Sequence, residues 1–160
     1  MPVLHLEASG EAADRDGKKA SLPPAQALLL RGPCVPVVVS LPQSAAKGLM
    51  ASGKAVPSMQ GLALIDTGAT TTCIDQEAAR QLGLPTIDQG EINSASHDKH
   101  PCNIHPVQIT IPLVGLSVEI PRTAGVSLKS QGLVALIGRD FLSRCTLFYN
   151  GPAGSLTLPF

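Results

Sequence analysis

Prolines and glycines interrupt this sequence along its whole length, and they limit its fold more than any other feature does. The chain of 160 residues contains 14 prolines and 15 glycines. Both residues end regular elements and favour turns, so their spread predicts many short elements, which favours strands over long helices. Hydrophobic residues make up 44% of the chain and aromatic residues only 2%, so we expect an aliphatic core. The sequence therefore predicts an all-β domain.

Strand-like runs recur from residue 34 to the C-terminus, and turn residues separate them. We expect strands at 34–42, 62–65, 70–74, 107–112, 116–120, 133–137, 145–149 and 155–158. A loop rich in Ser, Gly and Lys follows the first of them. One or two short helices are also expected. Asp75 can cap a helix over 76–82 that Gly83 ends, and the sequence RDFLSR at 139–144 predicts a helical turn.

The first 31 residues differ from the rest because they carry no motif. Their segment GEAADRDGKK is rich in charged residues, which disfavours a packed core. We therefore divide the chain into an N-terminal extension at 1–31, expected to be partly disordered, and one folded domain at 32–160. A domain of this length buries a core without disulfides.

Charge and cysteine content argue against several classes of function. Twelve basic and twelve acidic residues balance, so the chain lacks the basic footprint of a protein that binds nucleic acid or an anionic membrane. No apolar run approaches the ~20 residues of a membrane helix, and the N-terminus lacks the features of a secretory signal. We expect a soluble, cytoplasmic protein. The four cysteines are widely separated, so we expect buried free thiols at Cys34, Cys73, Cys102 and Cys145.

A carboxylate stands at the end of an apolar run in the stretch GLALIDTGATTTCID, residues 61–75. The run leads directly into Asp66, and Thr67, Gly68 and Ala69 follow as a turn. Asp, Thr and Gly are common turn residues, so the stretch can be an ordinary strand-to-turn junction. The alternative is that the strand positions a catalytic carboxylate. The rest of the sequence has to distinguish between these two interpretations.

The turn Asp66-Thr67-Gly68-Ala69 resembles the catalytic turn of the retropepsin-like aspartic proteases, the family of the retroviral proteases and their cellular relatives. About seventy residues downstream, the sequence ALIGRDFL at 135–142 resembles the hydrophobic–hydrophobic–Gly element of that family and the short helix after it. The resemblance covers roughly residues 34–160. It implies an all-β acid protease barrel with one or two short helices, assembled as a two-fold homodimer.

The resemblance also implies an aspartic endopeptidase whose active site two chains share. Hydrolysis of an amide without a covalent intermediate needs a base to activate water and an acid to protonate the carbonyl oxygen and the leaving amine. Two carboxylates that share one proton can do both. The sequence contains one DTG, so Asp66 from each subunit of a homodimer would supply the pair. We expect no cofactor and no metal, and a peptide or protein as the substrate.

The same resemblance assigns roles to the residues around the acid. Thr67 would connect the two active-site loops through hydrogen bonds across the dimer, and Gly68 would let the backbone approach water and substrate. Ala69 is the residue of retroviral enzymes, where pepsin-like enzymes have serine. In retroviral relatives the arginine after the hydrophobic–Gly element forms an ion pair with an acid near the active-site loop, which implies a structural role for Arg139 and its neighbour Asp140.

The C-terminal run at 155–158 alternates polar and apolar residues like an interface strand. In retroviral relatives the terminal strands of both subunits interleave into one sheet. We therefore expect this run to lie in the dimer interface and to pair with the partner subunit.

The segment between Gly90 and Val107 departs from the family pattern. A hairpin called the flap covers the active site in family members, and glycines at its tip let it open and close. Here the tip is occupied by Ser94, Ala95, Ser96, His97 and Asp98. The same segment holds four potential zinc ligands, His97, His100, Cys102 and His105. Their short spacing and the adjacent prolines disfavour a tetrahedral site.

Three hypotheses of function follow from these residues. The first is an endopeptidase that binds an extended peptide between two subunits. The second is a catalytically inactive module that keeps the retropepsin fold for dimerisation or peptide binding, and the third is a metal-binding module. A buried carboxylate pair would destabilise an inactive scaffold, so the retained DTG favours the enzyme.

Overall fold

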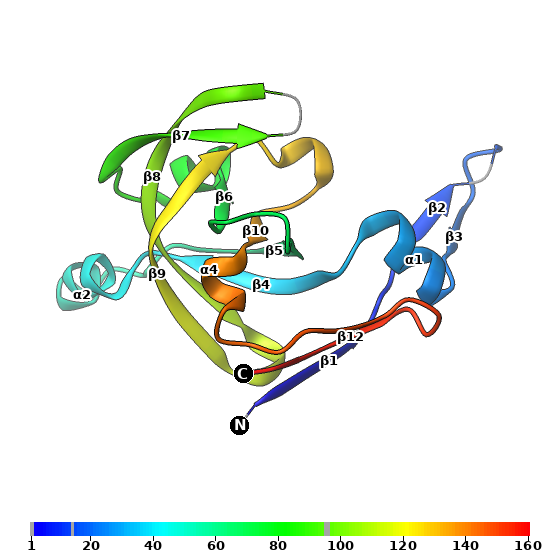
Figure 1. Ribbon diagram of the computed structural model, residues 1–160. Coiled ribbons are helices and arrows are strands. Elements are labelled where there is room, and N and C mark those ends of the chain that lie inside the picture. Colours follow the sequence, from blue (N-terminus) through cyan, green and yellow to red (C-terminus); the bar gives the residue numbers. More distant parts are fainter. Residues whose placement is uncertain (1, 14, 95–96) are drawn as a thin grey trace.

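The computed structural model describes residues 2–13, 15–94 and 97–160, and strands dominate this part of the chain (Figure 1). The strands are β1 (Val3–Glu7), β2 (Glu11–Ala13), β3 (Lys19–Ser21), β4 (Cys34–Ser40), β5 (Ser58–Ile65), β6 (Cys73–Asp75), β7 (Asp88–Ser94), β8 (His97–Ile111), β9 (Leu116–Val126), β10 (Ala135–Ile137), β11 (Phe148–Asn150) and β12 (Ser155–Pro159). The α-helices are α1 (Pro24–Arg31), α2 (Gln43–Ala51), α3 (Gln76–Leu82) and α4 (Arg139–Leu142). The expected all-β architecture is confirmed.

A closed barrel forms the body of the molecule. Strands β4, β5, β10, β6, β9 and β8 pair in this order, and β8 pairs back with β4, so the ring closes. Strand β7 adds to the outer edge of β8 as an antiparallel hairpin. Aliphatic side chains fill the barrel, as the composition predicts, and Val35, Ile74, Ile109 and Ile137 are among those fully buried.

Strand β10 lies between β5 and β6, and this arrangement brings the two sequence motifs together. It runs parallel to β5, with Ile137 opposite Ile65, and antiparallel to β6. Because the two parallel strands end side by side, Asp66 and Gly138 leave the sheet at the same edge. Residues 66–72, which connect β5 to β6, must therefore pass over the end of β10.

Helix α3 begins and ends as the sequence predicts. The Asp75 carboxylate caps it by accepting a hydrogen bond from the Ala78 N–H at 3.1 Å. Its other oxygen accepts from the Leu128 N–H at 2.8 Å, which ties the cap to a neighbouring loop. Gly83 ends the helix in the left-handed conformation with φ of 65°.

Helices α1 and α2 were not expected from the sequence. Helix α2 occupies the segment for which a loop was predicted, because Ala45, Ala46 and Leu49 pack against the core from one face of a short polar helix. Helix α1 buries Ala27 and Leu28. Among the helices that the structure describes, none is both long and apolar enough to cross a membrane.

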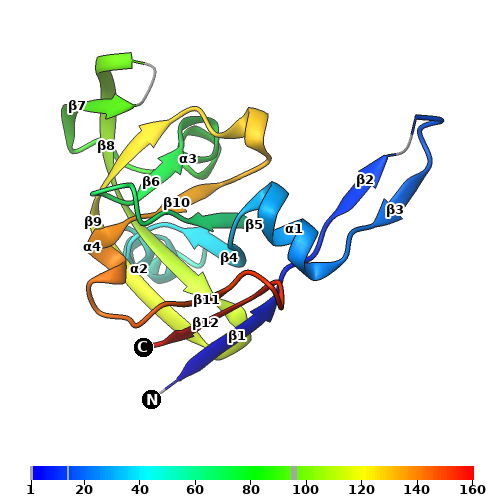
Figure 2. The ribbon, with the colours of Figure 1, turned by 45° about the vertical axis from the view of Figure 1, so that its right-hand side comes forward.

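Strands β1, β12 and β11 form a separate sheet that contains both ends of the chain (Figure 2). Strand β12 is its middle strand, paired with β1 on one side and with β11 on the other. The expectation that this terminal strand pairs with a partner subunit is therefore wrong, because its own chain occupies both edges. Its alternation instead places Leu156 and Leu158 in the core.

Residues 1–31, which the sequence sets apart as an extension, contribute β1 to this terminal sheet. Strands β2 and β3 form a hairpin that projects away from the barrel in both views (Figures 1 and 2). Helix α1 then leads back to β4. The division of the chain at residue 31 stays a prediction.

Candidate active site

Asp66 directly follows β5, at the edge of the barrel where β5 and β10 end. Ala63 and Ile65 are buried in the core, so strand alternation directs the next side chain, that of Asp66, to the opposite face. The Asp66 N–H donates a hydrogen bond to the Ile137 carbonyl over 3.0 Å, which anchors the backbone to β10. The Asp66 side chain is partly exposed. Two core strands thus hold an acid that water can reach.

The turn from Asp66 to Ala69 forms around one carboxylate oxygen. Oδ1 of Asp66 accepts hydrogen bonds from the Gly68 N–H at 2.8 Å and the Ala69 N–H at 3.2 Å. A Cβ atom on Gly68 would lie 3.1 Å from that oxygen, so glycine fits best there. Among the described residues, both hydrogen bonds to the Asp66 carboxylate go to Oδ1. The other oxygen, Oδ2, is therefore left for water or a second carboxyl group. Thr67 in the same turn is exposed.

Thr72 and Asp140 tie the end of the active-site loop to α4. Thr72 is fully buried, and its N–H donates to both carboxylate oxygens of Asp140 at 2.9 Å. The Thr72 hydroxyl donates to Asp140 Oδ1 at 2.7 Å and accepts a bond from the Gly138 N–H at 3.1 Å. Sequence reasoning gave Thr72 no role, because no local pattern marks a contact between residues 68 positions apart.

Arg139 braces the active-site turn, but through neutral oxygens. Its Nη1 donates to the carbonyls of Thr67 at 2.8 Å and Gly68 at 3.0 Å. Its Nη2 donates to the Thr70 hydroxyl at 2.8 Å. The ion pair implied by the resemblance is therefore not found among the described residues, because the side chain that Nη2 meets is a threonine. The structural role expected of Arg139 is present in this altered form.

Replacing Thr72 with valine should destabilise the protein by ~1–3 kcal/mol, because the buried Gly138 N–H loses its acceptor and Asp140 Oδ1 loses one of its three donors. The matched variant Thr72→Ser keeps the hydroxyl and loses one methyl group, which costs ~0.8 kcal/mol. Urea denaturation of the three proteins measures the difference. A valine variant as stable as the wild type would show that the hydroxyl contributes nothing.

Cys73 lies close to the site and is not activated as a nucleophile. Burial raises the pKa of the Cys73 thiol to about 11, and the nearby Cys102, Asp140 and Asp66 groups act in the same direction. The thiol is therefore neutral at physiological pH, and nucleophiles in cysteine proteases are thiolates. All four cysteines are free as expected, although only Cys102 is fully buried.

The flap segment forms the hairpin that the resemblance implies, from β7 and β8. The glycine-poor tip expected at 94–98 lies partly outside the described residues, as does the side chain of His97. His105 is buried, and its Nδ1–H donates to the Pro85 carbonyl at 3.1 Å, which accounts for this histidine without a metal. No group of three or more potential metal ligands gathers among the described residues.

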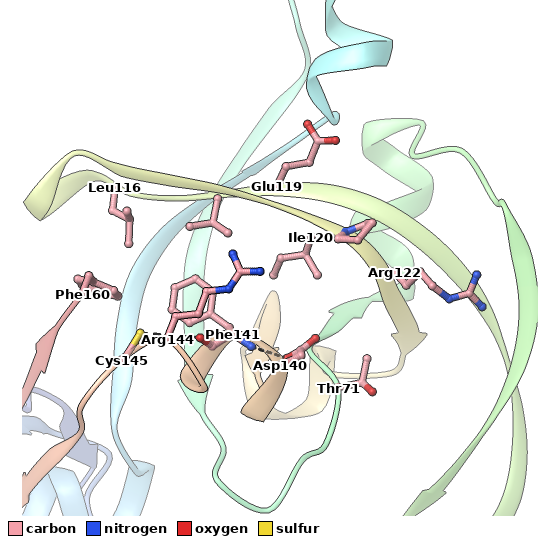
Figure 3. A pocket seen from close by; sticks show the side chains of 12 residues that line it. Thr71, Leu116, Glu119, Ile120, Arg122, Asp140, Phe141, Arg144, Cys145 and Phe160 are labelled. Atoms are coloured by element: carbon pink, nitrogen blue, oxygen red, sulfur yellow. Dashed lines mark hydrogen bonds between the residues drawn. The ribbon is translucent and has the colours of Figure 1, made fainter.

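A cavity of about 630 Å³ between β9 and α4 lies next to the Thr72–Asp140 contact. Figure 3 shows Asp140 and Thr71 at one end of it and Leu116 and Phe160 at the other. Asp66 is not among its lining residues, so a ligand in this cavity would not meet the acid.

Comparison with known proteins finds a family whose match covers both sequence motifs. The family model described as "gag-polyprotein putative aspartyl protease" matches residues 59–144, which include the turn at Asp66 and the element at Gly138. No curated protein matches the sequence. A solved structure of a retropepsin-like aspartic protease from Rickettsia conorii is similar with a TM-score of 0.44 and 16% sequence identity, over 98% of this chain and 92% of that one. The family match spans more than half of the chain and confirms the resemblance, so this chain belongs to the gag-polyprotein aspartyl protease family.

Proposed function

We propose that the chain is an aspartic endopeptidase that hydrolyses peptide bonds as a homodimer. The observation that carries the proposal is the turn after β5, where two backbone N–H groups hold one oxygen of the partly exposed Asp66 carboxylate. Membership of an aspartyl protease family supports this activity. One carboxylate cannot serve as base and acid in the same step, so a second Asp66 from a partner chain completes the site.

In this mechanism a water molecule lies between two Asp66 carboxyl groups that share one proton. The ionised group takes a proton from the water while the water oxygen attacks the scissile carbonyl carbon. The protonated group donates its proton to the carbonyl oxygen. The C–N bond of the resulting tetrahedral diol then breaks: the leaving nitrogen takes a proton from the protonated carboxyl group, and a diol hydroxyl gives its proton to the other carboxylate as the carbonyl re-forms, so the pair again shares one proton. The products are a carboxylic acid and an amine.

The residues around Asp66 hold this geometry. Gly68 and Ala69 orient the carboxylate, and Arg139 fixes the carbonyl groups of the turn from the other side. A catalytic group held by its neighbours needs little reorganisation during the reaction. Thr67 is exposed in the turn and is available for the contact with the partner subunit that the family resemblance implies.

The homodimer places the two turns at a two-fold axis, because the two carboxylates must meet. Strand β12 has no open edge, so the partner contacts other surfaces of the chain. An extended peptide would lie between the subunits and pair with strand-like backbone, as peptides do in related binding modes.

Incubation with a diverse peptide library from acidic to mildly alkaline pH tests the proposal. Mass spectrometry of new peptide ends reports cleavage, and the variant Asp66→Asn is treated in parallel. Two carboxyl groups that share a proton stop working when the pair loses that proton, so we expect cleavage by the wild type that is strongest on the acidic side. Equal cleavage by both proteins, or a rate that keeps rising above neutral pH, would contradict the mechanism. Absence of cleavage by the wild type would favour the inactive peptide-binding module.

A further inference from the structure

The cavity between β9 and α4 is lined mainly by apolar side chains. Its volume of about 630 Å³ falls within the ~300–1,000 Å³ typical of ligand pockets. Strand β9 contributes Leu116, Val118 and Ile120, and the opposite side contributes Phe141 and Phe160, whose rings meet edge to face with centroids 6.0 Å apart. Leu116, Val118 and Phe160 are only partly buried, so an apolar ligand would remove their remaining surface from water.

Of the four charged side chains that the structure describes around this cavity, three already have partners. Both oxygens of Asp140 accept hydrogen bonds from the active-site loop. The Glu119 carboxylate accepts a hydrogen bond from the Gln43 N–H at 2.9 Å, and Figure 3 shows it pointing away from the cavity. Arg122 forms an ion pair with Asp88 at 2.7 Å. These three side chains therefore leave little free charge for a ligand.

Arg144 is the fourth charged side chain, and it follows α4 directly after one intervening residue. Among the described residues its guanidinium group has no ion pair and no hydrogen-bond acceptor. Figure 3 shows this group turned toward β9, next to the apolar walls. Burial raises the pKa of the neighbouring Cys145 thiol, and the positive charge of Arg144 partly offsets this rise. An unpaired arginine beside apolar walls complements a carboxylate on an apolar body.

We propose that this cavity is a binding site for a small acid with an apolar body, such as a medium-chain fatty acid, whose carboxylate pairs with Arg144. Asp66 does not line the cavity, so this ligand would bind apart from the catalytic carboxylate. The proposal goes beyond the peptidase function and does not depend on it. A bound ligand would also contact α4, which holds the end of the active-site loop through Asp140.

Isothermal titration calorimetry with octanoate and octanamide tests the site. The two probes have the same chain and nearly the same shape, and only octanoate is charged at neutral pH. We expect octanoate to bind roughly tenfold more tightly, the factor that a hydrogen bond to a charged group is typically worth. The variant Arg144→Met keeps an apolar side chain and should remove this difference. The control Arg15→Met loses the same charge from an exposed position between β2 and β3 and should bind like the wild type.

Alkylation of the cysteines locates the ligand within the protein. Cys145 lines the cavity, whereas Cys34 on β4 is also partly buried and does not line it. We expect saturating octanoate to slow the reaction of Cys145 with N-ethylmaleimide and to leave the reaction of Cys34 unchanged. Mass spectrometry of the digested protein at several reaction times measures both rates.

These readouts use no cleavage, so their result is independent of whether the chain is a peptidase. Equal affinity for octanoate and octanamide, octanoate binding that survives Arg144→Met, or a Cys145 that octanoate does not protect would overturn the proposal. Absence of octanoate binding would overturn it too. If sedimentation then showed a dimer that Arg144→Met dissociates, the cavity would be assigned to contact with a second copy of the chain.

Discussion

Replacing Asp66 with asparagine is expected to lower the rate of peptide cleavage by ~10²–10⁴-fold or more, the range that one acid–base group contributes. Asparagine keeps the shape of the side chain and can still accept the bonds from Gly68 and Ala69 through its carbonyl oxygen. It cannot exchange a proton with water or substrate at the pH of the reaction. The turn should therefore survive while the chemistry stops, and initial rates on one cleaved peptide measure the loss.

A control for this variant removes a carboxylate elsewhere in the chain. Asp88 forms an exposed ion pair with Arg122 at 2.7 Å, and Asp88→Asn should leave the cleavage rate nearly unchanged. Circular dichroism of both variants checks that they fold. An Asp66→Asn protein that is folded and cleaves at the wild-type rate would remove Asp66 from the mechanism.

Replacing Gly138 with alanine is expected to destabilise the protein by ~3 kcal/mol or more, because the added methyl group has no space. A Cβ at this position would lie 2.6 Å from the carbonyl carbon of Thr71 and 2.9 Å from the Thr72 nitrogen. These are backbone atoms of the active-site loop, so the loop itself would have to move. For a chain of this length the loss corresponds to a fall in Tm of ~6–12 °C, and cleavage should fall as well.

Gly48 provides the comparison for that experiment. It lies within α2, and a Cβ there would meet no atom within 4 Å. Gly48→Ala should therefore leave cleavage unchanged and raise stability by ~0.5–1 kcal/mol, because alanine favours the helix. Differential scanning calorimetry of the two variants compares them directly, and a Gly138→Ala protein as stable as wild type would show that the loop is not packed as described.

The parts of the site that could be predicted are those written in contiguous residues. The turn from Asp66 to Ala69 needs only its own backbone N–H groups to hold the carboxylate, so the identity of these four residues is enough to predict it. The cap at Asp75 is equally local, because its partner Ala78 lies three positions away. The parallel pairing of β5 with β10 joins distant residues and is not written in either strand alone.

The parts that could not be predicted depend on contacts between distant residues. The alternation at 155–158 correctly predicts a strand, but a pattern of period two is the same whether the neighbour is β1 of the same chain or a strand of a partner. His5 and Thr157, which meet across β1 and β12, are 152 positions apart. Similarly, nothing near Arg139 in the sequence shows that Thr70 is its side-chain acceptor.

Helix α1 illustrates the same limit in the first part of the chain. Its polar surroundings gave no sign of order, yet Ala27 and Leu28 are buried and the helix contacts β12, which lies far along the sequence. Gly154, in the turn between β11 and β12, allows this contact, since a Cβ there would clash with the backbone of Pro24 and Ala25 in the helix. Such tertiary packing overrides the local preferences on which sequence reasoning depends.

The most direct test of the shared active site is a mixture of wild-type and Asp66→Asn subunits that are unfolded together and refolded so that they pair at random. Only dimers with two aspartates contain the carboxyl pair that shares a proton, so activity per total protein should follow the square of the wild-type fraction. An equal mixture is then expected to retain about a quarter of the wild-type activity. Retention of one half, in a linear relation to the wild-type fraction, would show that each chain works alone and would contradict the two-Asp66 mechanism.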